Sequence, residues 1–394
     1  MSRFDDMING LRQGAEVPDH VWEKYTYTLS NLPDRQSERK PHLLSRRRMW
    51  PVAAAAVLVI GTISVSAAAY IHWSRGLEER LRITAEQRQE LEKNQMASYV
   101  GQSVTQGEVT VTAQESIVDN YFAHLSFKVE GYQAEAGRQP GFSGIAVTVG
   151  EDEDYTGGWS ASFYDGIVPG PDGKAIHTDG TPLAEGEEIS YVMEDGSMEF
   201  HVDMMSDEKG AFFDKPIHVE LKDLGVYSGK AEDVAVEAEG DWSFDWILTG
   251  SEDVKKLELN APLEGSEAVI LEAELSPISV SVTYDFPRQS ETEMGTDENG
   301  EATVCTTYKE PPYFTGVRLK DGTIYTCISG GGISGYETED TDIYKSITAL
   351  ERVIDVDQIE SLLFIRSRPE GEQPLTEENL YFVSVEDVTS DWKN

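Results

Sequence analysis

Cysteines, histidines and clustered carboxylates are the residues with which this sequence could do chemistry. It has only two cysteines, Cys305 and Cys327, and each lies in a strand-like run. Neither belongs to a Cys-x-x-Cys pair, so we expect no metal site there. They form either a disulfide, which persists outside the reducing cytoplasm, or two buried thiols that pack as small apolar side chains.

The seven histidines are scattered along the chain. His124, His201 and His218 fall within strand patterns, and no two histidines have the spacing of metal ligands. We therefore expect structural roles for them. Motifs of hydrolases such as HExxH and GxSxG are missing from the sequence. The chain is accordingly predicted not to be an enzyme and to need no cofactor or metal.

Three further stretches have compositions typical of calcium or nucleotide sites, but we interpret them as loops. The acidic runs 151–154 and 297–300 do not match the spacing of an EF-hand calcium loop, so we expect solvated loops. Residues 330–335 fit G-x-G-x-x-G, but no helix pattern follows, and nearby acidic residues would repel a phosphate. A flexible loop is expected there instead of a nucleotide site.

A long apolar run organises the chain around these residues. No Asp, Glu, Lys or Arg occurs from Met49 through Ser74. A helix of roughly 20 apolar residues crosses a bilayer, so we predict one membrane span over residues 50–73. Arginines 46–48 place the N-terminus in the cytoplasm, which leaves the rest of the chain outside the cell. A cleaved signal peptide or a buried Ala-rich helix fits less well, because 48 residues precede the run and because it is long.

The charge is distributed unevenly about this span. Residues 1–49 hold nine Lys and Arg against seven Asp and Glu, about +2, whereas the whole chain carries −40. The outer part is therefore near −42. Such a surface repels phosphate, so nucleic acid is not an expected partner.

The cytoplasmic segment, residues 1–49, has two amphipathic stretches at helical spacing. We expect it either to dock on a cytoplasmic partner or to be an inert tail. The candidate contact residues are Phe4, Ile8, Leu11, Val21, Trp22, Tyr25 and Leu29.

Beyond the span, leucines predict a juxtamembrane helix over 74–100, with Thr84 as a cap for its second half. The period then changes to two, which is typical of strands, and Asp-Gly turns at 195–196 and 321–322 predict hairpins. The predicted fold is mainly β, with one transmembrane helix, the juxtamembrane helix and two extracellular β-sandwich domains. We place these domains at residues 101–260 and 261–394.

This plan resembles the single-pass anti-sigma-factor-like membrane proteins of Gram-positive bacteria. Besides the basic-flanked span, the resemblance rests on the motifs at 117–121, 240–244, 275–277 and 319–323. It implies immunoglobulin-like extracellular domains that sense an envelope signal or unknown ligand, and a cytoplasmic segment that sequesters a sigma factor of RNA polymerase. No Cys precedes Cys305, so the zinc-dependent variety is not matched. The alternative is a cell-surface binding or adhesive module with an inert cytoplasmic anchor.

Overall fold

The computed structural model describes residues 73–394, apart from residues 151–156, 171–172, 229–232, 253, 297–301, 339, 369–374, 386–389 and 393–394. The predicted cytoplasmic segment, nearly all of the predicted span and both acidic runs therefore lie outside the described residues. Within the described part, no helix is long and apolar enough to cross a membrane.

The juxtamembrane region differs from the single helix predicted over 74–100. It contains two short helices, α3 (Arg75–Arg80) and α4 (Ala85–Lys93), and strand β1 already begins at Ala97. Helix α3 ends because Arg82 adopts a φ of 51°, a left-handed conformation that a helix cannot continue through. Thr84 caps α4 as predicted, and its capping box with Gln87 restarts the helix.

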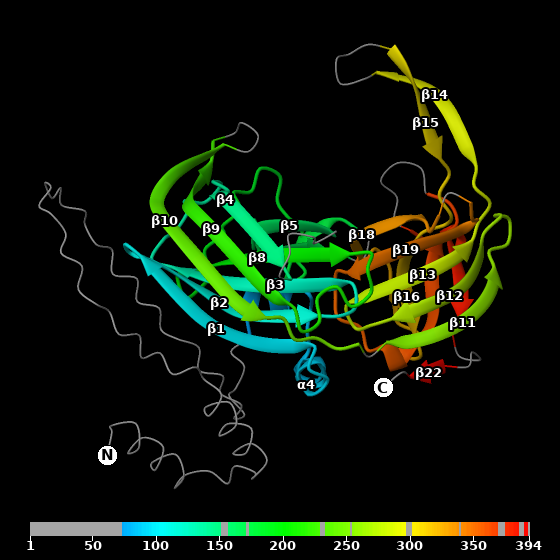
Figure 1. Ribbon diagram of the computed structural model, residues 1–394, viewed down its shortest axis with the longest axis horizontal. Helices are drawn as coiled ribbons and strands as arrows, with labels where there is room; N and C mark the ends of the chain where they lie inside the picture. Colours follow the sequence, from blue (N-terminus) through cyan, green and yellow to red (C-terminus); the bar gives the residue numbers. More distant parts are fainter. Residues whose placement is uncertain are drawn as a thin grey trace, which may run out of the picture. The chain divides into compact units, whose positions relative to one another are not determined.

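The first β-sandwich consists of a five-stranded sheet and a three-stranded sheet (Figure 1). Their strand orders are β1-β2-β3-β8-β5 and β10-β9-β4. Side chains such as Phe127, Phe200 and Trp242 fill the core between the sheets. The bounds are β1 Ala97–Gln106, β2 Val109–Val118, β3 Phe122–Glu130, β4 Pro140–Val149, β5 Gly157–Phe163, β8 Met198–Ser206, β9 Pro216–Tyr227 and β10 Val234–Ile247, and a small hairpin joins β6 Ile167–Pro169 to β7 Ala175–His177.

The second β-sandwich pairs a six-stranded sheet, β18-β19-β13-β12-β11-β22, with a four-stranded sheet, β17-β16-β20-β21. The boundary predicted at residues 260 and 261 falls inside β11, which pairs with β12 and so belongs wholly to this sandwich. The bounds are β11 Lys255–Pro262, β12 Val269–Leu275, β13 Ser279–Asp285, β16 Phe314–Leu319, β17 Ile324–Tyr325, β18 Ser329–Tyr336, β19 Ile343–Leu350, β20 Ile359–Ile365, β21 Leu380–Ser384 and β22 Ser390–Trp392, with β14 Ser290–Thr296 and β15 Ala302–Tyr308 forming a separate two-stranded ribbon and short 3-10 helices at Val356–Gln358 and Glu377–Asn379.

Two local predictions are corrected by the strand pairing. The hairpin predicted at the 195–196 turn does not form. Residues 188–193, which would be its first strand, are not a strand, because β3 and β5 occupy both edges of β8 and leave no place for a hairpin partner. The Gly-rich stretch 330–335 lies within β18, so the expected loop is a strand. The hairpin at 321–322 is confirmed, since β16 and β17 pair on either side of it.

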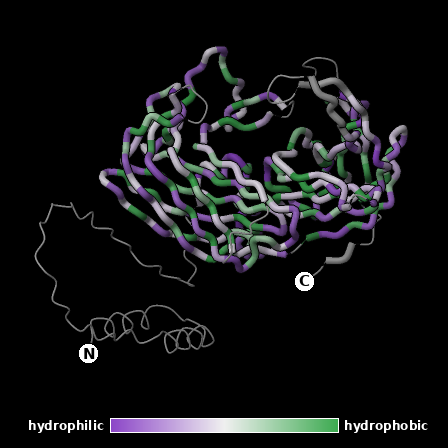
Figure 2. The backbone as a smooth tube through the Cα atoms, turned by 45° about the horizontal axis from the view of Figure 1, so that its top comes forward, coloured by the Kyte–Doolittle hydropathy of each residue, from purple (hydrophilic) through white to green (hydrophobic). Residues whose placement is uncertain are grey.

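Hydrophilic and hydrophobic residues alternate along the strands, in keeping with a period of two (Figure 2). A third apolar core brings together the two helices and both sandwiches. Leu77 and Leu91 come from α3 and α4, Ile117 from β2, and Ile278 and Ile347 from the second sandwich. The helices that follow the predicted span are therefore part of the packed body of the protein.

Candidate functional site

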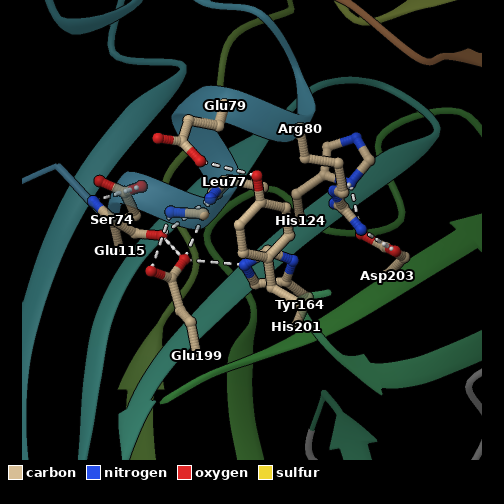
Figure 3. Close-up of polar contacts among 11 residues, drawn as sticks. Ser74, Leu77, Glu79, Arg80, Glu115, His124, Tyr164, Glu199, His201 and Asp203 are labelled. Carbon is tan, nitrogen blue, oxygen red and sulfur yellow. Dashed lines mark hydrogen bonds and ion pairs between the residues drawn. The ribbon is translucent and has the colours of Figure 1, made fainter. Parts of the chain in front are cut away.

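A buried polar cluster lies beneath α3, where the helix packs on the five-stranded sheet (Figure 3). We call its central part, Ser74, Gly76, Leu77, Glu115 and Glu199, the α3 anchor. Ser74 is the N-cap of α3, and the two carboxylates come from β2 and β8. Both glutamates are almost fully buried, with exposed fractions of 1% and 2%. Buried carboxylates are rare without partners, so the hydrogen bonds of this pair define what the site does.

Glu199 binds the open N-terminus of α3. It accepts hydrogen bonds from the backbone amides of Gly76 (2.9 Å) and Leu77 (3.0 Å) and from the Ser74 hydroxyl. His201 Nε2 donates a further bond of 2.8 Å to it. The first amides of a helix have no intrahelical partner, and the helix dipole is positive there. Glu199 therefore satisfies two amides of α3 that have no acceptor within the helix.

Glu115 has far fewer donors. Its Oε1 accepts one hydrogen bond of 3.1 Å from the Ser74 amide. Its Oε2 is buried without a hydrogen-bond partner among the described residues. Burial raises the pKa of Glu115 well above its usual range, the Ser74 amide opposes that shift, and the charge of Glu199 adds to it. The surroundings of Glu115 therefore favour its protonated form.

A second polar group fixes the C-terminal end of α3. Arg80 donates two hydrogen bonds of 2.6 Å to Asp203, and His124 Nδ1 lies 2.6 Å from the same carboxylate. Burial opposes the charge of Asp203, but Arg80 and His124 outweigh it and hold the Asp203 pKa well below its ordinary value. Tyr164 donates a 2.8 Å bond to Glu79 on the same helix.

The last residue of the predicted span is also held in place. The Trp73 indole donates a 2.7 Å hydrogen bond to Glu92 of α4. The Arg88 guanidinium lies 5.5 Å from the centre of the Trp73 ring, within cation–π range. The last residue of the predicted span is thus bound by side chains of α4, directly before the cap of α3.

A separate set of polar contacts joins the two sandwiches, and we call it the sandwich joint: Asp119, Tyr121, Lys209, Glu274, Ser276 and Ser279. Asp119 accepts hydrogen bonds from the amides of Tyr121 and Phe122, both 2.9 Å, and from the hydroxyls of Ser276 and Ser279. Two of the motifs behind the family resemblance, 117–121 and 275–277, therefore meet at this joint.

The polar groups at both places bind one another and backbone amides. No group of three or more metal-ligating side chains occurs in the described part of the chain. Within the α3 anchor the titratable groups cap a helix and close an interface. This arrangement is suited to holding an element in place and, where a proton is gained or lost, to releasing it.

The structure does not describe the side chains on which two of the sequence predictions depend, the partner-binding residues and the disulfide. Phe4, Ile8, Leu11, Val21, Trp22, Tyr25 and Leu29 lie outside the described residues, so their role stays a prediction. Cys327 is half-buried after β17, and Cys305 lies in β15, but the side chain of Cys305 is not described. The disulfide therefore also stays a prediction.

Sequence reasoning missed the α3 anchor. The structural roles expected for His124 and His201 fit their buried positions, but nothing in the sequence connects them to α3. One signal was present: Ser74 follows directly on the apolar run and precedes charged residues typical of a first helical turn. Glu115 and Glu199 gave none, because alternation assigns a residue to a face without saying what covers that face.

Comparison with known proteins adds one family match. A family described as a domain of unknown function, DUF4179, matches residues 44–131, which run from the end of the predicted cytoplasmic segment through β3. No curated protein matches the chain. Among solved structures it is similar to "The crystal structure of the conserved domain protein from Bacillus anthracis", at 11% identity and a TM-score of 0.32, with 77% of this chain and 94% of that chain covered. The matched DUF4179 region thus contains α3, α4 and Glu115.

Proposed function

We propose that this protein is a membrane-anchored regulator of the anti-sigma-factor kind. In this proposal the cytoplasmic segment, residues 1–49, sequesters an extracytoplasmic-function sigma factor. Residues 50–73 cross the membrane, and two immunoglobulin-like sandwiches outside the cell sense an envelope signal. Trp22, Tyr25 and Leu29 supply apolar anchors for the partner, since aromatic side chains carry much of the energy at protein interfaces.

One observation supports a regulator above all: Trp73, the last residue of the predicted span, and Ser74 after it are bound by the folded body. Trp73 is bound by α4, and Ser74 and Leu77 are bound by Glu199. Leu77 is fully buried in the core shared by the helices and both sandwiches. A change in how the sandwiches pack therefore acts on the residues that directly follow the predicted span.

An adhesive module has no use for such a junction. Its anchor only has to keep the binding domains near the cell, and a Gly/Ser-rich or Pro-rich linker does that while leaving the domains free to reorient. Two capped helices with a buried polar cluster order many residues at a cost in conformational entropy. That cost is understandable where the junction transmits a change.

The test is a transcription assay in the native host. Deletion of residues 1–49 should switch on the genes that depend on the sequestered sigma factor, and the Trp22→Ala, Tyr25→Ala double variant should do the same. A Gln36→Ala, Ser37→Ala variant, in the polar stretch before the span, is the matched control and should stay repressed.

A second variant examines the junction itself. A flexible Gly-Ser insertion between Trp73 and Ser74 should leave the sandwiches folded but make sigma-dependent transcription insensitive to envelope stress. Unchanged transcription after deletion of residues 1–49 would remove the regulator from consideration and leave the surface module.

A further inference from the structure

The two carboxylates of the α3 anchor lie on one face of the sheet. Glu115 pairs directly with Ser126 of β3, and Ser126 pairs with His201 of β8, two residues from Glu199. Both carboxylates bind Ser74, the first through its amide and the second through its hydroxyl. A single residue of the helix cap therefore joins two buried acids.

The donors are shared unequally between these acids. Glu199 has four, two of them amides at the helix N-terminus, and Glu115 has one. In addition, Glu115 Oε2 and Ser126 Oγ are both buried and without a partner among the described residues. A buried ionised carboxylate with an unpartnered oxygen is strongly disfavoured, whereas a protonated one is neutral and gains a donor.

No lysine or arginine among the described residues is bound to Glu115. The charge of Arg88 lowers the Glu115 pKa, and the charge of Glu78 beside it raises the same pKa. Arg80 is engaged by Asp203, and Arg88 is bound to Glu78. The other charged and titratable groups facing the cluster pair among themselves: Glu79 with Tyr164, His201 with Glu199, and His124 with Asp203. Loss of the Glu115 proton would therefore place a second negative charge beside Glu199, with only the Ser74 amide to receive it.

We propose that Glu115 is a proton-binding site that locks α3 onto the five-stranded sheet. While Glu115 holds its proton, the only carboxylate charge in the anchor is that of Glu199, which two amides of α3, the Ser74 hydroxyl and His201 stabilise by hydrogen bonds. When the proton leaves to solvent water, the two carboxylates repel each other and α3 separates from β2 and β8. The proton is then the ligand whose gain or loss sets the position of the junction.

The direction of the pH dependence follows from which form is favoured in the docked state. Burial raises the pKa of Glu115, so its contribution to docking is complete in acid and is lost as the pH rises through the docked-state pKa. Burial lowers the pKa of His201, so its contribution is present above the ordinary pKa of a histidine and is lost as the pH falls into the range in which a solvated histidine is charged. Docking is therefore strongest between these limits, and Glu115 sets the alkaline one.

Hydrogen exchange of the full chain in lipid nanodiscs tests the proposal. Protection of the amides of residues 74–81, corrected for intrinsic exchange, should fall at least about tenfold between about pH 6 and about pH 9. Glu115→Gln copies the neutral acid and should keep its protection throughout. Glu108→Gln, in the exposed turn between β1 and β2, is the matched control and should behave as the native chain does.

Two further readouts keep the outcome clear. Glu199→Gln removes the charge at the helix N-terminus and should lower protection at every pH. An infrared band of a protonated carboxylic acid should be present in the native chain at neutral pH and missing from Glu115→Gln, even if that variant packs poorly. Protection that does not change with pH, or the same band in both proteins, would overturn the proposal.

This inference extends the proposed regulator by giving it a proton-operated input. Its test reads the docking of α3 directly, without any sigma factor. Failure of the exchange experiment would leave the transcription assay unaffected, and failure of the transcription assay would leave the lock at Glu115 standing.

Discussion

The α3 anchor and the sandwich joint are both buried polar contacts, but they treat their carboxylates differently. At the joint, Glu274 lies 2.9 Å from Lys209 Nζ and 3.3 Å from Lys256 Nζ. Burial opposes its charge, yet the two lysines outweigh this and lower its pKa. At the anchor, no lysine or arginine of the described part of the chain is bound to Glu115, and burial raises its pKa.

This difference separates permanent contacts from conditional ones. A carboxylate held by two cations stays ionised at neutral pH, so the joint loses stability only as the pH falls through the lowered pKa. A carboxylate left with a single amide donor changes state on the alkaline side instead. The first sandwich therefore has one interface that keeps the two sandwiches together and another that releases α3.

The largest expected effect is the loss of α3 docking when its apolar contacts are removed. Leu77 is fully buried in the third core. Leu77→Ala removes three carbon atoms from this core and should cost about 3 kcal/mol of the free energy that docks α3. Hydrogen exchange of residues 74–93 measures it. Ile247→Ala, at a side chain that is 53% exposed, is the control and should change this protection little. Unchanged protection in Leu77→Ala would show that α3 is not held by packing.

The next largest effect is expected where the sandwich joint loses the carboxylate of Asp119. Asp119→Ala leaves two backbone amides and two serine hydroxyls without their buried acceptor. The cost should be about 2 kcal/mol, which is within the range for buried donors that lose their partner. Chemical denaturation of the full chain should show the two sandwiches unfolding separately. Asp119→Asn keeps one oxygen and should be milder; a single unchanged transition in Asp119→Ala would contradict the role given to this residue.

The sequence predicts the architecture better than the interfaces, for a physical reason. Alternation identifies strands such as β2 and β8 because it reflects one buried and one polar face. The polar face of β8 carries Glu199, His201 and Asp203, and such a face is normally solvated. Helix α3 covers it instead, and this long-range contact leaves no trace in the local pattern. The hairpin predicted at 195–196 fails for the same cause, because β8 pairs with strands far from it in the chain.

A third prediction removes a cation from the sandwich joint, so that Glu274 has fewer positive partners, as Glu115 does in the α3 anchor. Lys209→Met removes one of the two cations at Glu274, so the pKa of Glu274 should rise. Because the lowered pKa gives stability that is lost as the pH falls, that loss should begin at a higher pH in the variant. The cost at neutral pH should be about 1 kcal/mol, since Lys209 is partly exposed. Acid titration followed by exchange at residues 118–122 measures the shift, and Lys215→Met at the start of β9 should leave the titration in place.

The smallest expected effect is at Asp195. Like the carboxylates of the sandwich joint, it has hydroxyl, amide and lysine partners, but it is exposed. Asp195 accepts bonds from the Ser197 hydroxyl (2.5 Å) and amide (3.0 Å) and lies 3.0 Å from Lys128 Nζ. These partners lower its pKa to about 2. Its contribution to the turn is present above the ordinary pKa of an aspartate and is lost as the pH falls through about 2. Because its side chain is 57% exposed, Asp195→Asn should cost at most about 0.5 kcal/mol. If Asp195→Asn lost as much stability as Asp119→Ala, the number of donors, and not burial, would set the strength of these contacts. The sandwich joint and the α3 anchor would then differ only in the charges that surround their carboxylates.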